Sequence, residues 1–150
     1  MIKPPPSIRR EHEQLHAELD KACALPGPVG EAARQVARIM HPHFLREDEY
    51  AAPPLRLLRD LAAGHVRPDM KAVIPLVDRL KEEMPFMLQE HRAIQSALLA
   101  LERAAEAEGL TAQATFAESL RLHAEAEEEV FYPAAILVGE YLKLKLSEGR

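Results

Sequence analysis

Histidines and glutamates at repeated spacings are the residues of this 150-residue chain best suited to chemistry. His43 is followed four positions later by Glu47, and the same step recurs as His123 and Glu127, a shift of 123 − 43 = 80 positions. Residues four apart lie about 6 Å apart on one face of a helix. Each pair therefore presents an imidazole nitrogen and a carboxylate oxygen to one cavity. Imidazole suits iron, zinc and copper, and bridging carboxylates suit paired metal ions.

A second repeat has nearly the same period. Glu11 and His12 recur as Glu90 and His91, a shift of 91 − 12 = 79 positions. The two shifts agree to within one residue, and each His-Glu pair is also followed by a proline ten residues after its histidine. This agreement indicates two similar halves, each contributing two histidines and one glutamate.

The elements that must position these residues are expected to be helices. Alanine, leucine, glutamate and arginine dominate the chain, and β-branched residues are few. Prolines and glycines divide it into long segments of helical periodicity, at about 7–25, 29–52, 85–108 and 111–132. We expect an all-α, up-down-up-down four-helix bundle with a helical insertion over 55–83 and a short C-terminal helix over 135–146. Pro85 is expected to begin the third long helix, and Pro133 to end the fourth.

The histidines and glutamates fall on the apolar stripe expected to face inward. Steps of three and four give inward series of Met87, His91, Ile94, Leu98 and Leu101, of Phe116, Leu120, His123, Glu127 and Val130, and of Val36, Ile39 or Met40, His43, Glu47 and Tyr50. Burying four imidazoles and two carboxylates together costs several kcal/mol for each unpaired charge. Two divalent cations would offset this cost. For any single residue, the alternative is a hydrogen-bonded packing role or an ion pair.

Composition excludes several other classes of function. The formal net charge is −5 with no dense Lys/Arg cluster, which argues against a nucleic-acid or membrane-surface partner. The single cysteine, Cys23, excludes an internal disulfide and a Cys-rich metal site. The first residues lack the apolar region of a secretory signal, and no apolar run approaches the roughly 20 residues of a membrane span. We expect one cytoplasmic domain over residues 1–150.

The remaining histidines and acidic residues are expected to lie outside the site. His41 is two residues from His43 and should face away from the metal, and His65 falls in a predicted loop. Several acidic residues are interpreted as a solvated face on which one carboxylate could orient a ligand imidazole, namely Glu11, Glu90, Glu128 and Glu129.

These motifs resemble those of the hemerythrin-like family, also called the HHE cation-binding domain. The resemblance covers about residues 8–133 and rests on His12, His43xxxGlu47, His91 and His123xxxGlu127. In that family two non-haem iron ions lie inside a four-helix bundle and are bridged by two carboxylates. The resemblance implies that His12 and His43 bind one iron ion, and that His91 and His123 bind the other. The two glutamates of the repeat, Glu47 and Glu127, would bridge the ions. These ligands would also accept zinc or manganese.

Two departures separate the chain from the oxygen-carrying hemerythrins. Those proteins have HxxxH on the third helix and an aspartate five residues after the last helix's histidine, whereas this chain has His91xxxGln95 and Glu127. The HxxxH spacing occurs instead at His12 and His16. His16 is therefore a candidate fifth nitrogen ligand, with a polar or outer role as the alternative. As a ligand, it would leave the His91 side open to a small molecule.

Three functions fit these features. The first is a non-haem di-iron protein that binds or senses a small ligand such as dioxygen, nitric oxide or peroxide. The second is a di-iron enzyme of oxidative or nitrosative stress defence or of iron handling, and the third is a metal-free helical interaction domain. The sequence identifies neither a protein partner nor an oligomeric state.

Overall fold

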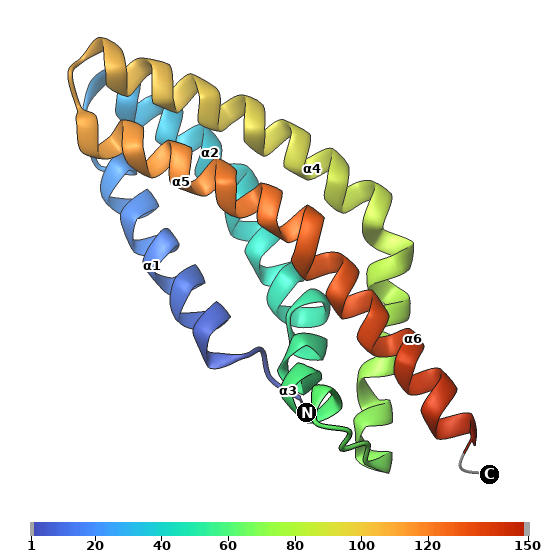
Figure 1. Ribbon diagram of the computed structural model, residues 1–150. Coiled ribbons are helices and arrows are strands. Elements are labelled where there is room, and N and C mark those ends of the chain that lie inside the picture. Colours follow the sequence, from blue (N-terminus) through green and yellow to red (C-terminus); the bar gives the residue numbers. More distant parts are fainter. Residues whose placement is uncertain (1, 149–150) are drawn as a thin grey trace.

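The structure is a computed structural model that describes residues 2–148. Helices account for 89% of it, and the described residues contain no strand, which confirms the all-α prediction. Residues 1, 149 and 150 of the predicted domain lie outside this range. The main helices run side by side (Figure 1); they are α1 (Pro6–Cys23), α2 (Gly27–Arg46), α4 (Ile74–Ala107), α5 (Thr111–Ala126) and α6 (Tyr132–Glu148). Within the described part, no helix is long and apolar enough to cross a membrane.

The packing centres on α4. This helix contacts α2 and α5 along its C-terminal part and α6 along its N-terminal part, while α1 lies mainly against α2. α4 is longer than predicted, because it begins at Ile74 and continues through Pro85. A proline within a helix removes one backbone hydrogen bond and bends the helix rather than necessarily ending it. Figure 1 shows α4 bending in its yellow-green stretch.

Two wide helical turns interrupt the main helices at equivalent places in the two halves. The π-helical turns η1 (Glu47–Ala51) and η4 (Glu127–Phe131) each begin at a glutamate of the repeat. In each turn the amide five residues on, at Ala52 or Tyr132, donates a hydrogen bond to the glutamate carbonyl. A wide turn of this kind is often found at functional sites.

The prediction that Pro133 ends a helix is wrong. η4 leads directly into α6, so that α5, η4 and α6 form one continuous helical path (Figure 1). Pro133 lies in the first turn of α6, where its missing N–H is tolerated. The predicted separate C-terminal helix over 135–146 is therefore the body of α6. It packs against α4 and the segment between α2 and α4.

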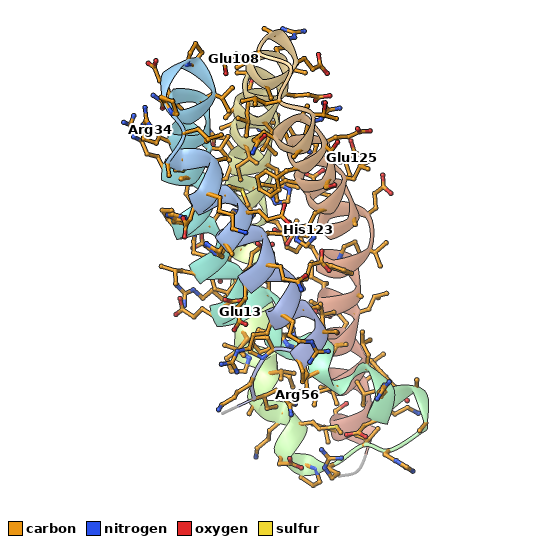
Figure 2. All side chains as sticks on the ribbon, turned by 90° about the vertical axis from the view of Figure 1, so that its left-hand side faces the viewer. Glu13, Arg34, Arg56, Glu108, His123 and Glu125 are labelled. Carbon is orange, nitrogen blue, oxygen red and sulfur yellow. The ribbon has the colours of Figure 1, made fainter. Side chains whose placement is uncertain are left out.

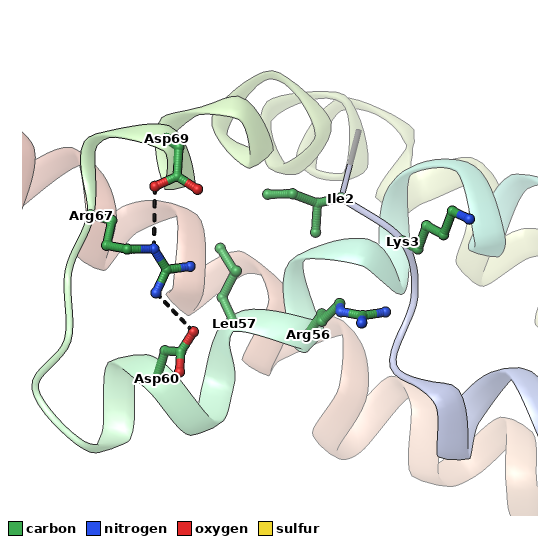
Figure 3. Close-up of a pocket in the computed structure, with 7 residues that line it drawn as sticks. All are labelled: Ile2, Lys3, Arg56, Leu57, Asp60, Arg67 and Asp69. Carbon is green, nitrogen blue, oxygen red and sulfur yellow. Dashed lines mark hydrogen bonds and ion pairs between the residues drawn. The ribbon is translucent and has the colours of Figure 1, made fainter.

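The predicted helical insertion is present, in short pieces. It comprises η2 (Pro53–Leu57), α3 (Leu58–Ala62) and η3 (Pro68–Val73), with a turn at Gly64 whose φ of 83° favours glycine. Figure 3 shows the pocket beside this segment, where the Arg67 guanidinium lies between Asp60 and Asp69.

The core is divided into apolar clusters along the helices. One cluster fills the end where α2, α4 and α5 meet, with Met40, Leu98 and Leu120 among its buried residues. A second, around Leu80 and Met87, lies between α4, α6 and the turns η1 and η2. The predicted inward series of α4 is confirmed, because all five of its members are buried. The layer between the two clusters is polar, and it holds the residues of the repeat.

A glycine at the contact between α6 and α4 yields a first testable prediction. A Cβ added at Gly139 would lie 2.5 Å from Val77 Cγ1. Alanine normally stabilises a helix by roughly 1 kcal/mol relative to glycine. We nevertheless expect Gly139→Ala to lower the free energy of unfolding by about 1–3 kcal/mol, because the helices must move apart. Urea unfolding measures this change.

The matched control removes the obstructing side chain. In a Val77→Gly background, Gly139→Ala is expected to be far less destabilising or even stabilising, because the Val77 Cβ and both Cγ atoms that the added Cβ would meet are gone. A gain in stability in the wild-type background would contradict the close approach of the two helices.

Candidate metal centre

Six of the seven predicted site residues lie together in the polar layer. They come from α1, α2, η1, α4, α5 and η4, and each is at most 8% exposed, namely His12, His43, Glu47, His91, His123 and Glu127. Figure 2 labels His123 about midway along the length of the helices. The helical spacings of the repeat bring each histidine and its glutamate to the same inner face.

The structure divides these residues into two groups that share Glu127. Within each group, one ligand atom per residue lies within 4.8 Å of the others. One group contains His43, Glu47, His91 and Glu127, and the other contains His12, His123 and Glu127. Opposite ligands of one ion with bonds of about 2.1 Å lie roughly 4 Å apart, so each group is close to the size of a coordination shell.

The pairing of histidines differs from the prediction. His12 was expected beside His43, and His91 beside His123. Instead the His43 and His91 Nε2 atoms are 2.8 Å apart, and the His12 and His123 ring centroids are 5.3 Å apart. α2 lies against α4, which brings His43 and His91 together, and the remaining two histidines meet between α1 and α5.

The group around His12 and His123 contains unpaired polar atoms. Nε2 of His12, Nε2 of His123 and Oε1 of Glu47 are buried without a hydrogen-bond partner. A buried polar atom without a partner costs about 1–3 kcal/mol. When unprotonated, all three atoms carry lone pairs suited to a cation, so a metal ion that displaces their protons would satisfy them together. Because these buried atoms have no other partner, the residues present fit a metal centre.

Each of the four histidines is oriented by a carboxylate on its other ring nitrogen. The Nδ1 atoms lie 2.5–3.3 Å from a carboxylate oxygen, in the pairs His12–Asp48, His43–Glu90, His91–Glu128 and His123–Glu11. A carboxylate accepts the Nδ1–H and leaves the Nε2 lone pair directed at the centre, as is usual for metal-bound histidines. One carboxylate of the predicted solvated face was expected to be able to orient an imidazole, and three of them do so, namely Glu11, Glu90 and Glu128.

The orienting carboxylates also follow the repeat. Glu11 and Glu90 directly precede a histidine of the site, and Asp48 and Glu128 directly follow a glutamate of the site. Each carboxylate nevertheless contacts the histidine of a different helix. Two of these contacts, His43–Glu90 and His123–Glu11, join the two halves of the repeat, and the other two lie within one half.

The two central glutamates carry different charges when no metal is present. Burial and the proximity of Glu127 raise the pKa of Glu47 well above its usual value. Burial acts against ionisation of Glu127 as well, but the neighbouring Glu47 carboxyl and the His12 and His123 imidazoles outweigh it and hold the Glu127 pKa well below its usual value. Burial lowers the His12 pKa, yet the nearby carboxylates of Asp48 and Glu127 outweigh that effect and raise it to about 9. In the metal-free protein, protons on Glu47 and His12 thus offset part of the negative charge of the central carboxylates, which a metal ion would otherwise offset.

His16 lies apart from both groups. Its ring stacks on His41, with centroids 5.0 Å apart, and lies 4.3 Å from the Phe44 ring centroid. The predicted fifth nitrogen ligand is therefore not brought to the centre. Burial and the neighbouring His41 lower the His16 pKa. His41 was expected to face solvent, and it is half-exposed, with Nε2 3.6 Å from Asp20.

Tyr132 is the residue of the centre that the sequence did not indicate. Its hydroxyl donates a hydrogen bond to Glu47 Oε2 at 2.6 Å. An uninterrupted α-helix would turn Val130 inward, as predicted, but Val130 is 55% exposed. The wide turn η4 places Tyr132 above Glu127 instead, because a π turn closes over five residues. The tyrosine before Pro133 was visible in the sequence, but its orientation was not.

A small cavity reaches the centre from the side of α1. Its volume is about 10 Å³, close to the space needed for one water molecule, and His12, Glu47, Ala52 and Glu127 contribute to its lining. A larger outer pocket of about 710 Å³ lies beyond it. The same three side chains line both spaces, namely Ile8, Leu55 and Phe131.

Comparison with known proteins adds no further evidence on this site. No protein-family model, curated protein or solved structure matches the chain.

Proposed function

We propose that the chain is a hemerythrin-like, non-haem di-iron protein that binds or senses a small ligand such as dioxygen, nitric oxide or peroxide. In this proposal α5, η4 and α6 count as one helix of a four-helix bundle, with α1, α2 and α4 as the others. His43 and His91 would bind one ion, and His12 and His123 the other. Glu127 touches both groups, so it would bridge the ions together with Glu47.

The observation that carries the proposal is the direction of the imidazoles. Four buried histidines have Nδ1 beside a carboxylate and Nε2 directed at a shared centre. In a metal-free interaction domain this arrangement would leave lone pairs facing one another at a cost in stability. Buried ionisable clusters of this kind usually mark function.

The preference for iron rests on the donor set together with the resemblance of the motifs to the hemerythrin-like family. Mixed imidazole and bridging carboxylate ligands suit iron, and zinc or manganese would fit the same atoms. When bound, an iron pair supplies redox chemistry and an open coordination position for a small ligand. The inner cavity of about 10 Å³ is close to the space needed for one water molecule, which fits a small ligand rather than a bulky substrate.

Metal analysis of the purified protein tests the proposal. We expect about two iron ions per chain after anaerobic loading with Fe(II), and His123→Ala to remove at least one, because Nε2 of His123 is a donor without another partner. His65→Ala is the matched control, because His65 is exposed, and it is expected to retain both ions. Absence of bound metal from the wild-type protein would contradict the proposal and favour an interaction domain.

Rapid mixing separates binding from turnover. A reversible absorbance change after the reduced, iron-loaded protein meets dioxygen or nitric oxide supports binding or sensing. Steady consumption of peroxide would instead support the alternative of an enzyme.

A further inference from the structure

Tyr132 occupies one half of the proposed centre and is only 2% exposed. Its hydroxyl oxygen lies 3.0 Å from His91 Nε2 and 3.3 Å from His43 Nε2. The same oxygen is 2.6 Å from Glu47 Oε2. The phenol oxygen therefore lies among the proposed ligand atoms of the centre, at hydrogen-bond distance from three of them.

There are too few protons for these atoms to hydrogen-bond with one another. The Nδ1–H groups of His43 and His91 face Glu90 and Glu128, which leaves a lone pair on each Nε2. The two Nε2 atoms are nevertheless only 2.8 Å apart. Tyr132 has a single hydroxyl proton, and the carboxylate of Glu47 is its closest acceptor. Three lone-pair-bearing atoms thus converge, and a cation between them would satisfy all three.

The distances among the three atoms also match one face of a metal's coordination shell. Adjacent ligands of an octahedral ion with bonds of about 2.1 Å lie roughly 3.0 Å apart. The triangle formed by His43 Nε2, His91 Nε2 and the Tyr132 oxygen has sides of 2.8, 3.0 and 3.3 Å. Iron accepts a tyrosine oxygen as a ligand in other protein settings.

We propose that Tyr132 is a metal ligand, and that its phenolate oxygen binds the ion held by His43 and His91. This inference rests on the proposed function, because it assumes that the centre binds iron. Coordination replaces the O–H bond of Tyr132 with an oxygen–metal bond, and the proton leaves by way of Glu47 to solvent. No electron is transferred in this step.

The same inference makes the two halves of the centre unequal. The position equivalent to Tyr132 in the first half is Ala52, since 132 − 80 = 52. The inner cavity is lined by Ala52, His12 and the edge of Tyr132, but not by the histidines His43, His91 and His123, so His12 is the histidine of the centre that faces it. Tyr132 therefore completes the shell of one ion, and the open position falls on the ion held by His12 and His123. This is the opposite side from the one expected from sequence.

Optical spectroscopy of the iron-loaded, oxidised protein tests the assignment directly. Ferric phenolate gives charge-transfer absorption in the visible range, and resonance Raman excitation in that band enhances the phenolate ring vibrations. We expect both signals in the wild-type protein and their loss in Tyr132→Phe, with iron retained. Tyr50→Phe is the matched control, because Tyr50 is equally buried but its hydroxyl contacts Met87 Sδ rather than the centre. It should retain both signals.

The outcomes separate this inference from the proposed function. Wild-type protein that holds two iron ions without phenolate vibrations would overturn the role of Tyr132 and leave the di-iron centre intact. Persistence of the band in Tyr132→Phe would do the same. Absence of iron from the wild-type protein would overturn both proposals. The wild-type spectrum decides the assignment even where the variant fails to fold.

Discussion

Replacing Glu127 with alanine is expected to abolish the proposed binding of two metal ions. Glu127 is the only residue common to both ligand groups of the described chain. One carboxylate oxygen lies 3.4 Å from His91 Nε2, and the other lies 3.3 Å from His123 Nε2 and 3.7 Å from His12 Nε2. Loss of this bridge removes a charged donor from each ion. We expect affinity at each position to fall by more than about 100-fold, the upper end of the loss seen when an outer partner of a ligand is removed.

Metal content and isothermal titration with Fe(II) measure this effect. Glu129→Ala is the matched control, because Glu129 lies in the same turn η4 but is exposed. Glu127→Gln keeps the shape without the charge and should fall between the two. Near-wild-type affinity for two ions in Glu127→Ala would show that Glu127 does not bridge the centre.

Removal of the metal is expected to give the second largest effect, a loss of thermal stability. A ligand that binds only the folded chain contributes about 2.7 kcal/mol for each site when its free concentration is 100 times Kd. For a domain of this size, that energy corresponds to a fall in Tm of roughly 5–10 °C for each site. The metal-free chain also keeps unpaired buried atoms at His12, His123 and Glu47. Thermal unfolding with and without a chelator measures the difference.

The metal-dependent part of this stability should increase with pH. The His12 pKa is raised to about 9 by Asp48 and Glu127, so in the metal-free protein a proton occupies this site below pH 9. Considered by itself, protonation of His12 stabilises the folded metal-free chain at low pH, and this stabilisation is lost as the pH rises through about 9. Metal binding must displace the proton, so affinity rises by about tenfold per pH unit for each proton released below that pKa. The rise in Tm on adding metal is measured between pH 6 and 8, with His65→Ala as the control protein. A rise that does not change with pH would contradict His12 as a ligand.

The sequence by itself indicated six residues of the candidate centre and the helix faces that carry them. The spacings of His43 and Glu47, and of His123 and Glu127, are local helical geometry, which the chain fixes within one or two turns. The inward series of α4 followed from the same period, and its members are buried. The all-α class followed from composition. These inferences depended only on neighbours along the chain.

The tertiary structure alone decided how the ligands are combined. Contacts between helices, which no local spacing specifies, pair His43 with His91 and His12 with His123. They also bring Glu11, Glu90 and Glu128 onto histidines of other helices. Carboxylates that lie on the outer face of their own helix thus contact histidines of a neighbouring helix, which the spacing along one helix does not reveal.

The wide turn η4 decided the role of Tyr132. Five residues rather than four close this turn, and Tyr132 after it is buried while Val130 within it is exposed, whereas both equivalent residues at η1, Tyr50 and Ala52, are buried. The same turn places Pro133 in the first turn of α6, where its missing N–H costs little, so the helix continues instead of ending. An α-helical period applied to the sequence cannot anticipate one inserted residue, and every position after it shifts to another face.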